Sequence, residues 1–350
     1  MNVTLNRDLL RRLCAENGTS GREDTVRALI LRELVETGIP QEDITVDRLG
    51  NILVHWRGKE PAKRRILFSA HMDEVALMVT YIHEDGTLAF DTVGGINAAA
   101  VIGRQVQVGK DRISGVIGCK PVHLLAKDAR TKPAEMHSLF CDIGAKDKAE
   151  AMQYVSLGDI IYFCDDACVF GEDSFCSKAI DDRFGCALLL TLLAEKPQQE
   201  MWCSFVVQEE IGLRGAGCAA YQIDPDIAVV FEATTAADIA GSEGADQVCR
   251  LGGGAVISFM DGRTVYDKAL YDEAVRICEE NGIRWQTKTK IAGGNDAGAI
   301  QSAGDGVRVL AVSVPCRYLH APQSVIRLSD AEECTRLAAL LTALADGDDL

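Results

Sequence analysis

The spacing of hydrophobic residues predicts alternating helices and strands near both ends of the chain. Apolar residues recur every three or four positions in some segments, which is typical of amphipathic helices, and form short runs in others, which is typical of strands. Helices are predicted at residues 6–17, 23–37, 182–194, 266–281 and 331–345, and strands at 44–57, 65–70, 201–207, 227–231, 255–260 and 307–314. Ser20 is expected to cap the second helix. This alternation indicates an α/β fold, in which helices cover both faces of a largely parallel or mixed sheet.

The middle of the chain has a different pattern. Between residues 75 and 163 the signals are strand, turn and glycine, and only residues 146–154 look helical. Strands are predicted at residues 75–82, 87–90, 104–108 and 113–119. We therefore expect one domain made of residues 1–74 and 164–350, with a small β-rich domain, residues 75–163, inserted into it. The alternative is that this region only extends the same sheet.

The composition is that of a globular protein with little affinity for nucleic acid or membranes. The chain has 350 residues, of which 47% are hydrophobic and 25% charged, and its formal net charge is −16. Nucleic acid and anionic lipid both attract basic surfaces, so neither is expected as the main partner. No apolar stretch reaches the ~18 residues of a membrane span, and the polar start of the chain lacks the apolar core of a signal peptide. We expect a cytoplasmic protein.

The cysteines support the same compartment. Thirteen of them are scattered along the chain, several inside apolar runs. An odd number in a chain of this size favours free thiols in a reducing compartment over a disulfide framework. Cys164 and Cys168 form a C-x3-C pair, but no second pair stands in zinc-finger register, so a structural zinc site is not expected there.

Polar residues that could bind metal follow several of the predicted strands. Ligands of open α/β sheets bind beyond the carboxyl ends of the strands. The candidates there are His71, Asp73, Glu209, Glu210, Glu232 and His320, together with the pair Asp181-Asp182 at the start of a helix. So many carboxylates in one cleft would repel each other unless cations compensated them. Carboxylate and imidazole ligands together suit zinc, cobalt or manganese.

Two short spacings indicate a division of roles. In an extended chain His71 and Asp73 point to the same side, so Asp73 could accept the imidazole N–H and orient His71 as a metal ligand. The side chains of the neighbours Glu209 and Glu210 diverge. One of them could bind metal while the other stays free as a general base, and the spacing alone does not decide which.

Six ordered motifs resemble the M42 family of metallo-aminopeptidases, which includes glutamyl and tetrahedral aminopeptidases and proteins labelled endoglucanase M. The motifs are Ala70-His71-Met72-Asp73-Glu74-Val75, Lys178-Ala179-Ile180-Asp181-Asp182-Arg183-Phe184-Gly185, Val207-Gln208-Glu209-Glu210-Ile211-Gly212-Leu213, Phe231-Glu232-Ala233-Thr234, Gly293-Gly294-Asn295-Asp296-Ala297-Gly298 and Arg317-Tyr318-Leu319-His320. They span nearly the whole chain.

The resemblance implies a zinc-peptidase-like catalytic domain with two divalent metal ions, Zn²⁺ or Co²⁺ before Mn²⁺. By analogy, His71 and Glu232 would hold one metal, and Glu210 and His320 the other. Asp181 would bridge both metals, because the bridging residue of the family stands four positions before a glycine, here Gly185. Glu209 would be the general base.

The chain departs from the family pattern at two positions. Glu232 stands where the family usually has Asp, and Asn295 stands where Thr is common. Glutamate is a competent metal ligand, so the first departure bears on metal affinity or selectivity.

The resemblance also implies a partner and a substrate. Family members have a PDZ-like or barrel-like insertion and commonly form a homo-oligomer, a tetrahedral dodecamer with an internal chamber that admits short peptides. The function implied is a cytosolic aminopeptidase that removes N-terminal residues.

Three other functions compete with this one. A two-metal carboxypeptidase or deacylase would share the water chemistry, and a metal-bound assembly scaffold would not need the free base Glu209. A glycoside hydrolase would need two carboxylates facing each other about 5–10 Å apart across a sugar, and would not need His71 or His320.

Overall fold

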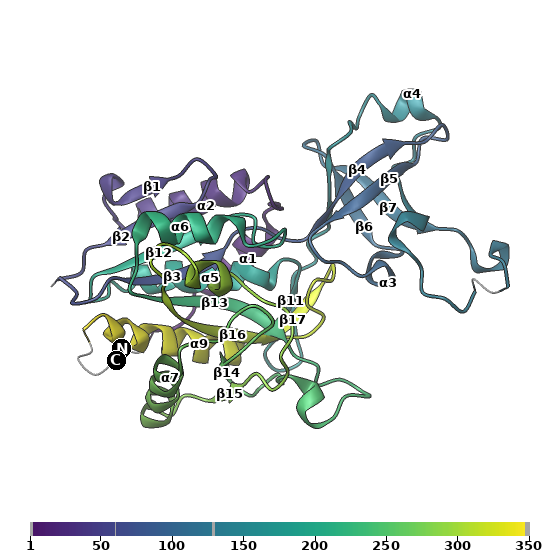
Figure 1. The fold of residues 1–350 in the computed structure, drawn as a ribbon. Coiled ribbons are helices and arrows are strands. Elements are labelled where there is room, and N and C mark those ends of the chain that lie inside the picture. The colour runs from purple at the N-terminus through teal and green to yellow at the C-terminus, as the bar shows by residue number, and fades with distance from the viewer. Residues whose placement is uncertain (1–2, 60, 128–129, 347–350) are drawn as a thin grey trace.

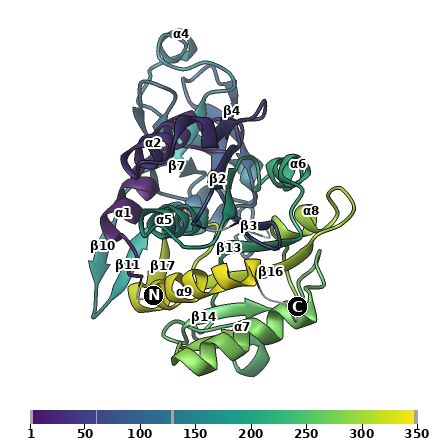
Figure 2. The ribbon, with the colours of Figure 1, turned by 90° about the vertical axis from the view of Figure 1, so that its left-hand side faces the viewer.

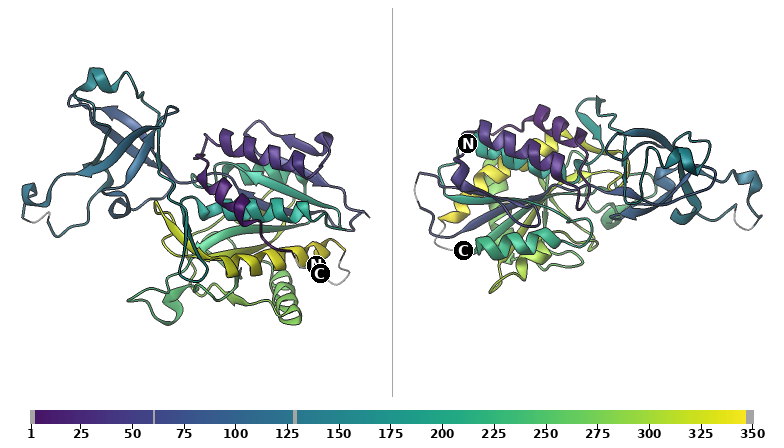
Figure 3. Two further views of the ribbon diagram at one scale, coloured as in Figure 1. Left: turned by 180° about the vertical axis from the view of Figure 1, so that it is seen from behind. Right: turned by 90° about the horizontal axis from the view of Figure 1, so that it is seen from above.

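The computed structural model describes residues 3–59, 61–127 and 130–346. An α/β body carries a separate barrel, which is joined to it by strands (Figures 1 and 3). The helices and 3-10 turns are α1 (Arg7–Ala15), α2 (Asp24–Glu36), η1 (Gln41–Asp43), α3 (Ala98–Val101), η2 (Val122–Leu124), η3 (Met136–Ser138), α4 (Lys148–Ala151), α5 (Ile180–Ala194), α6 (Arg214–Ile223), η4 (Gly244–Gln247), α7 (Lys268–Asn281), α8 (Ala297–Gln301), α9 (Leu328–Leu341) and η5 (Thr342–Ala345).

The body is built on a mixed sheet, as the alternation of elements predicts. Its strands, in spatial order, are β1 (Ile44–Val46), β2 (Ile52–Trp56), β12 (Met201–Val206), β3 (Ile66–His71), β13 (Ile227–Thr235), β16 (Arg308–Cys316), β14 (Ala255–Ser258) and β15 (Trp285–Thr287). The central strands β12, β3, β13 and β16 run parallel to one another. Their carboxyl ends therefore meet at one edge of the sheet.

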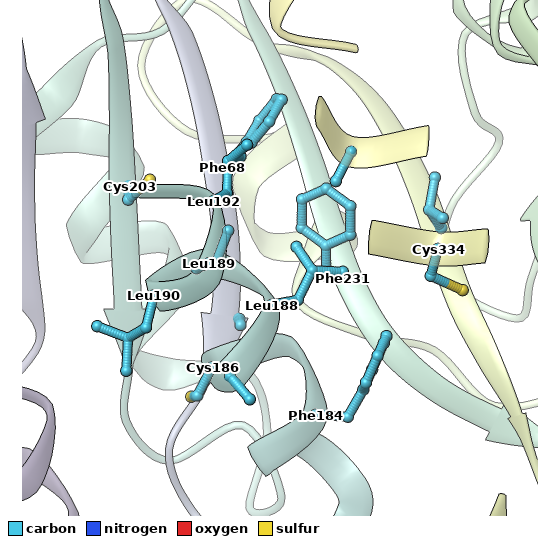
Figure 4. Close-up of a cluster of buried hydrophobic side chains, with 14 of the residues drawn as sticks. Phe68, Phe184, Cys186, Leu188, Leu189, Leu190, Leu192, Cys203, Phe231 and Cys334 are labelled. Carbon is cyan, nitrogen blue, oxygen red and sulfur yellow. The ribbon is translucent and has the colours of Figure 1, made fainter. Parts of the chain in front are cut away.

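Helices cover both faces of this sheet. Successive strand residues alternate between two core clusters: Phe68 packs with α1, α2, α5, α7 and α9, whereas Leu67 packs with α6 and α8. Figure 2 shows α1 and α5 on one side of the central strands and α6 and α8 on the other. Helix α5 is buried nearly all round, and Phe68 meets Phe231 edge to face at 5.3 Å (Figure 4). The fold class predicted from the sequence is confirmed.

The predicted β-rich insertion is a closed barrel. Its strands, in order around the barrel, are β4 (Ala76–Ile82), β5 (Leu88–Val93), β8 (Leu139–Asp142), β7 (Ile113–Cys119), β6 (Gln105–Val108) and β9 (Ile160–Phe163). They enclose a core of their own around Leu77, Val106 and Ile161. Because the strands close on each other, this unit does not extend the main sheet, which excludes the alternative arrangement.

A small sheet lies near the junction between barrel and body. It contains β10 (Cys168–Phe170), β11 (Ser174–Ser177) and β17 (Ser324–Arg327). Strand β11 is followed by the start of α5, and β17 lies between the segment after β16 and α9. The small sheet therefore pairs two parts of the chain, each of which adjoins a segment at the carboxyl edge of the main sheet. The sequence pattern did not predict β10, β11 or β17, which are three or four residues long.

Three local predictions differ from the structure. The strand predicted at residues 44–57 is the hairpin β1–β2, because Asp47 accepts the N–H groups of Leu49, Gly50 and Asn51 and folds the chain into a turn. Ser20 does not cap α2, which begins after Glu23, since its hydroxyl donates to Asp73 instead. The helix predicted at residues 146–154 is the short α4.

Helix α6 was not predicted because its sequence is rich in small residues. The helix contains Gly215 and Gly217, which disfavour helix formation in isolation. The packing explains Gly215: a β-carbon there would lie 2.4 Å from both the Asn51 Oδ1 and the Val207 carbonyl oxygen. Tertiary packing therefore overrides the local propensity at this position.

A buried ion network fixes the loops that carry the candidate ligands. Lys178 Nζ donates to both oxygens of Glu74, at 2.8 and 2.9 Å, and Arg183 Nη2 contacts the same carboxylate at 3.3 Å. Arg183 Nε also donates to the Met72 carbonyl oxygen at 2.8 Å. The network joins the segment that directly follows His71, the last residue of β3, to the start of α5, which contains Asp181.

Replacing Glu74 with Gln should strongly destabilise the fold. The substitution leaves the buried cations of Lys178 and Arg183 without their carboxylate, which typically costs about 3–5 kcal/mol. The measurement is the free energy of unfolding from equilibrium urea titration. Asp272→Asn, which removes the exposed partner of Lys268, is the matched control and should change it by less than about 0.5 kcal/mol. Equal effects of the two substitutions would show that the buried network does not carry the stability assigned to it.

Candidate metal centre

The candidate ligands meet at the carboxyl edge of the main sheet, as the sequence predicts. His71 is the last residue of β3, and Glu232 lies near the end of the neighbouring strand β13. Glu209 and Glu210 follow β12, and His320 follows β16. Asp181 reaches the same edge from the start of α5. Segments far apart in the sequence thus supply one cluster of imidazoles and carboxylates.

Asp181 lies between the two imidazoles. Its Oδ1 is 3.3 Å from Nε2 of His71, and its Oδ2 is 3.3 Å from Nε2 of His320. Each oxygen of the carboxylate therefore faces a different histidine. This is the arrangement that a carboxylate shared between two cations requires.

A second carboxylate accompanies each imidazole. Glu232 Oε2 lies 3.7 Å from Nε2 of His71, and Glu210 Oε2 lies 3.4 Å from Nε2 of His320. Ligand atoms of His71, Asp181 and Glu210 lie within 4.8 Å of one another, and so do those of His71, Asp182 and Glu232. His71 therefore belongs to both clusters, and the carboxylates of Glu210 and Glu232 lie close to it in different clusters.

The chemistry of these atoms fits divalent cations. Among the residues that the structure describes, His71 Nε2, Asp181 Oδ1 and Glu232 Oε1 are buried and make no hydrogen bond. Buried polar atoms are normally paired, so unpaired ligand atoms on three neighbouring residues fit a site for a cation. Imidazole nitrogen and carboxylate oxygen are ligands that zinc, cobalt and manganese accept.

The electrostatics of the cluster lead to the same conclusion. Burial raises the pKa of Glu209 to about 11, that of Glu210 to about 8 and that of Glu232 to about 7, and neighbouring carboxylates add to each shift. Without compensation, these groups cannot all be ionised at neutral pH. Divalent cations would supply the compensating charge.

The two adjacent aspartates have different surroundings. The carboxylate of Asp182 accepts the N–H of Gly185 at 2.8 Å and the N–H of His71 at 3.2 Å, so its oxygens are occupied by main-chain donors. The peptide bond between Asp181 and Asp182 is cis. Of the pair, Asp181 is the one that faces both imidazoles, in agreement with the choice that the family resemblance implied.

Asp73 contacts more than the imidazole. Nδ1 of His71 lies 3.0 Å from the carbonyl oxygen of Asp73 and 3.5 Å from its carboxylate, so the main chain makes the closer contact with the ring. The carboxylate accepts the Ser20 hydroxyl at 2.6 Å and the N–H groups of Glu209 and Glu210 at 3.0 and 3.2 Å. It therefore fixes the turn that presents both glutamates, a role that the sequence did not indicate.

A cavity of about 530 Å³ opens beside the cluster. Asp181, Glu209, Glu210, Glu232 and His320 contribute to its lining. Farther from the cluster, the lining also includes Arg263, Lys288, Gly293, Gly294 and Asn295. The space is large enough for an amino-acid side chain next to the candidate ligands.

Asn295 has a structural explanation. Its Oδ1 accepts the N–H of Ala297 at 3.0 Å, at the start of α8, and lies 3.3 Å from the hydroxyl oxygen of Tyr266, whose proton is donated to Asp261 at 2.6 Å. The side chain thus joins α8 to the segment before α7, on the wall of the cavity. The longer Glu232 is accommodated as well, since its carboxylate still reaches His71.

Asp296 is the buried acid that the sequence did not single out for chemistry. It is fully buried, and neither carboxylate oxygen makes a hydrogen bond within the described part of the chain. Burial raises the pKa of Asp296 well above its usual value. Its place in the Gly293–Gly298 motif was the available signal.

Comparisons with known proteins identify the family of the chain. A family model described as M42 glutamyl aminopeptidase matches residues 50–337. A putative aminopeptidase of Acetivibrio thermocellus is 35% identical over 332 residues, covering 94% of this chain and 96% of the relative. The glutamyl aminopeptidase of Lactococcus lactis is 32% identical over 351 residues, covering 96% of each chain.

Solved structures with the same fold are also similar in sequence. The TET1 peptidase of Pyrococcus horikoshii, which can assemble into a tetrahedron or a large octahedral shell, matches with a TM-score of 0.84 and 32% identity. The match covers 98% of this chain and 99% of that chain. Both the α/β body and the barrel therefore have counterparts in one known architecture.

Proposed function

The chain belongs to the M42 glutamyl aminopeptidase family, and on that premise we propose that it is a two-metal aminopeptidase that removes N-terminal residues from short peptides. The observation that carries the proposal is Asp181, whose oxygens face His71 and His320 at 3.3 Å each. His71 and Glu232 would hold one divalent cation and His320 and Glu210 a second, with Asp181 as the carboxylate available to both. Zn²⁺ and Co²⁺ suit these ligands best, with Mn²⁺ as an alternative.

Glu209 is the general base. When bound, two divalent cations supply Lewis acidity, which lowers the pKa of a shared water and polarises the carbonyl of the scissile bond. The carboxylate of Glu209 takes a proton from that water and passes it to the leaving amine. Asp73 holds the main chain of Glu209 in place during both transfers.

The charge of the site restricts cleavage to the first peptide bond. The free α-amine of a peptide would bind one of the cations or a nearby carboxylate, whereas an internal residue has no free amine to offer. The cavity then receives the first side chain. Arg263 and Lys288 line it, and Lys288 Nζ also donates to the Ala292 carbonyl oxygen at 3.0 Å. The carboxylate of Asp261, which lines it too, accepts the Tyr266 hydroxyl and the N–H groups of Arg263 and Thr264. An acidic first residue is therefore favoured.

The barrel domain, residues 75–163, serves self-assembly in this proposal. The similar Pyrococcus horikoshii peptidase assembles into closed shells and shares the whole architecture. A homo-oligomer, with a dodecamer as the preferred form, would enclose the active sites and admit only short peptides.

We place the enzyme in the cytoplasm. Within the described residues the cysteines are free thiols, which supports a reducing compartment. None of the described helices is long and apolar enough to cross a membrane.

Peptidase activity should depend on divalent cations. Exhaustive chelation should abolish release of the first residue from aminoacyl chromogenic substrates, and Zn²⁺, Co²⁺ or Mn²⁺ should restore it, because the buried carboxylates need cations to bind water and substrate. Glutamyl and aspartyl substrates should be cleaved faster than leucyl ones. C-terminally blocked substrates in the same panel separate an aminopeptidase from a carboxypeptidase. N-acetylated substrates separate it from a deacylase. Full activity in protein shown to be metal-free by elemental analysis would refute the two-metal mechanism.

The base and the ligand should respond differently to the same substitution. Glu209→Gln removes only the proton acceptor, so kcat should fall by about 10²–10⁴-fold while both cations stay bound. Glu210→Gln should weaken one cation site, and part of its activity should return at high metal concentration. Metal stoichiometry is measured beside kcat for both variants. If Glu209→Gln loses a cation and Glu210→Gln does not, the two roles are reversed.

A further inference from the structure

Two cysteines face each other across the small sheet at the junction of barrel and body. Cys168 on β10 is the register partner of Cys176 on β11 in an antiparallel pair. Directly opposed residues of antiparallel strands have Cα atoms about 4.5–5.5 Å apart, and a disulfide spans about 4.4–6.8 Å between Cα atoms. The two thiols are also close enough to interact through their side chains. The separation expected for such a pair lies within the range that a disulfide spans.

We infer that Cys168 and Cys176 form a reversible disulfide that acts on the segment carrying His320. The pair lies outside the metal centre, and neither cysteine has a part in the reaction proposed above. Cys168 is exposed and Cys176 is partly exposed, so small oxidants reach the pair. Most of the other cysteines in the described chain are buried, with Cys218 on α6 as a further exposed thiol.

The thiol of Cys176 has a specific partner, which links it to the metal centre. Its Sγ donates to Gln323 Oε1 at 3.2 Å, and Gln323 Nε2 donates to the carbonyl oxygen of Cys164 at 3.4 Å. Gln323 lies in the short connection between His320 and β17, and Cys164 directly follows the last barrel strand. The amide of Gln323 thus ties the His320 segment both to β11 and to the barrel.

Oxidation removes one of these ties. A disulfide sulfur has no hydrogen to donate, so Gln323 Oε1 loses the Cys176 donor. The amide of Gln323 is then held by the Cys164 contact alone, so the His320 segment keeps one side-chain contact fewer, while the pairing of β17 with β11 remains. Strand β11 ends at Ser177, shortly before Asp181. The small sheet therefore adjoins both the segment that contains Asp181 and the segment that contains His320.

The chemistry balances with a low-molecular-weight disulfide as oxidant. The exposed Cys168, as its thiolate, attacks one sulfur of the oxidant and releases one small thiol. The thiol of Cys176, as its thiolate, then attacks the mixed disulfide at Cys168 and releases a second small thiol. The protein gains one S–S bond, the oxidant loses one, and the two thiol protons leave on the released thiols.

The test uses the full-length, metal-loaded protein and bis(2-hydroxyethyl) disulfide. After differential alkylation, mass spectrometry should show a linked pair of peptides containing Cys168 and Cys176, which dithiothreitol separates again. Cys168→Ser and Cys176→Ser should each abolish the link, and Cys218→Ser should leave it unchanged. Free thiols at Cys168 and Cys176 under conditions in which Cys218 has reacted would overturn the assignment. This readout does not depend on peptidase activity, so it stands apart from the proposed function.

The effect on His320 rests on the proposed function and is tested separately. Oxidation should lower kcat/KM by about two- to fivefold, the equivalent of one lost weak hydrogen bond, and dithiothreitol should restore it. Cys176→Ser keeps a hydroxyl donor for Gln323 and should have unchanged basal activity, whereas Cys176→Val should reproduce the fall without oxidant. Unchanged kcat/KM in fully oxidised protein, or equal activity of Cys176→Ser and Cys176→Val, would refute the coupling. If the reduced enzyme cleaves no aminoacyl substrate, the proposed function fails while the disulfide assignment remains.

Discussion

The structure is organised around a concentration of negative charge at one buried edge of a sheet. Asp181, Glu210 and Glu232 lie within a few ångströms of two imidazoles, and the pKa values of both glutamates are raised by burial. Isolated buried carboxylates are costly, and they persist in folded proteins when paired with cations. The parallel strands bring these groups together, and cation binding would turn their mutual repulsion into a pair of adjoining sites. The proposed hydrolytic chemistry follows from that single constraint.

The surroundings of the cluster keep these groups in position. Glu74, Lys178 and Arg183 connect the loop after His71 to the helix that begins near Asp181. Asp73 fixes the main chain of Glu209 and Glu210. Asp73, Glu74, Lys178 and Arg183 themselves do not line the cavity beside the cluster. Together they fix the positions of the candidate ligands and of Glu209, and such supporting contacts give metal sites affinity and a defined geometry.

Part of this arrangement could be predicted from the sequence. The alternation of apolar runs predicts the sheet, and polar residues after the strands predict the cluster, because parallel strands end at a common edge. Other features depend on contacts between distant segments. The hydroxyl of Ser20 pairs with Asp73 rather than with the helix it precedes, Gly215 is required by its approach to Val207, and Cys168 meets Cys176 only through the register of a short hairpin. Residue spacing left the choice between the two glutamates open, and the family resemblance supplied an assignment that remains a proposal.

The central claim is that Asp181 is shared between two cations. Anomalous diffraction from crystals of the zinc-loaded protein, recorded on both sides of the zinc absorption edge, tests it most directly. The account predicts two anomalous peaks, one between Asp181 Oδ1, His71 and Glu232 and the other between Asp181 Oδ2, His320 and Glu210. A single peak at full zinc occupancy, or two peaks of which only one contacts Asp181, would contradict it.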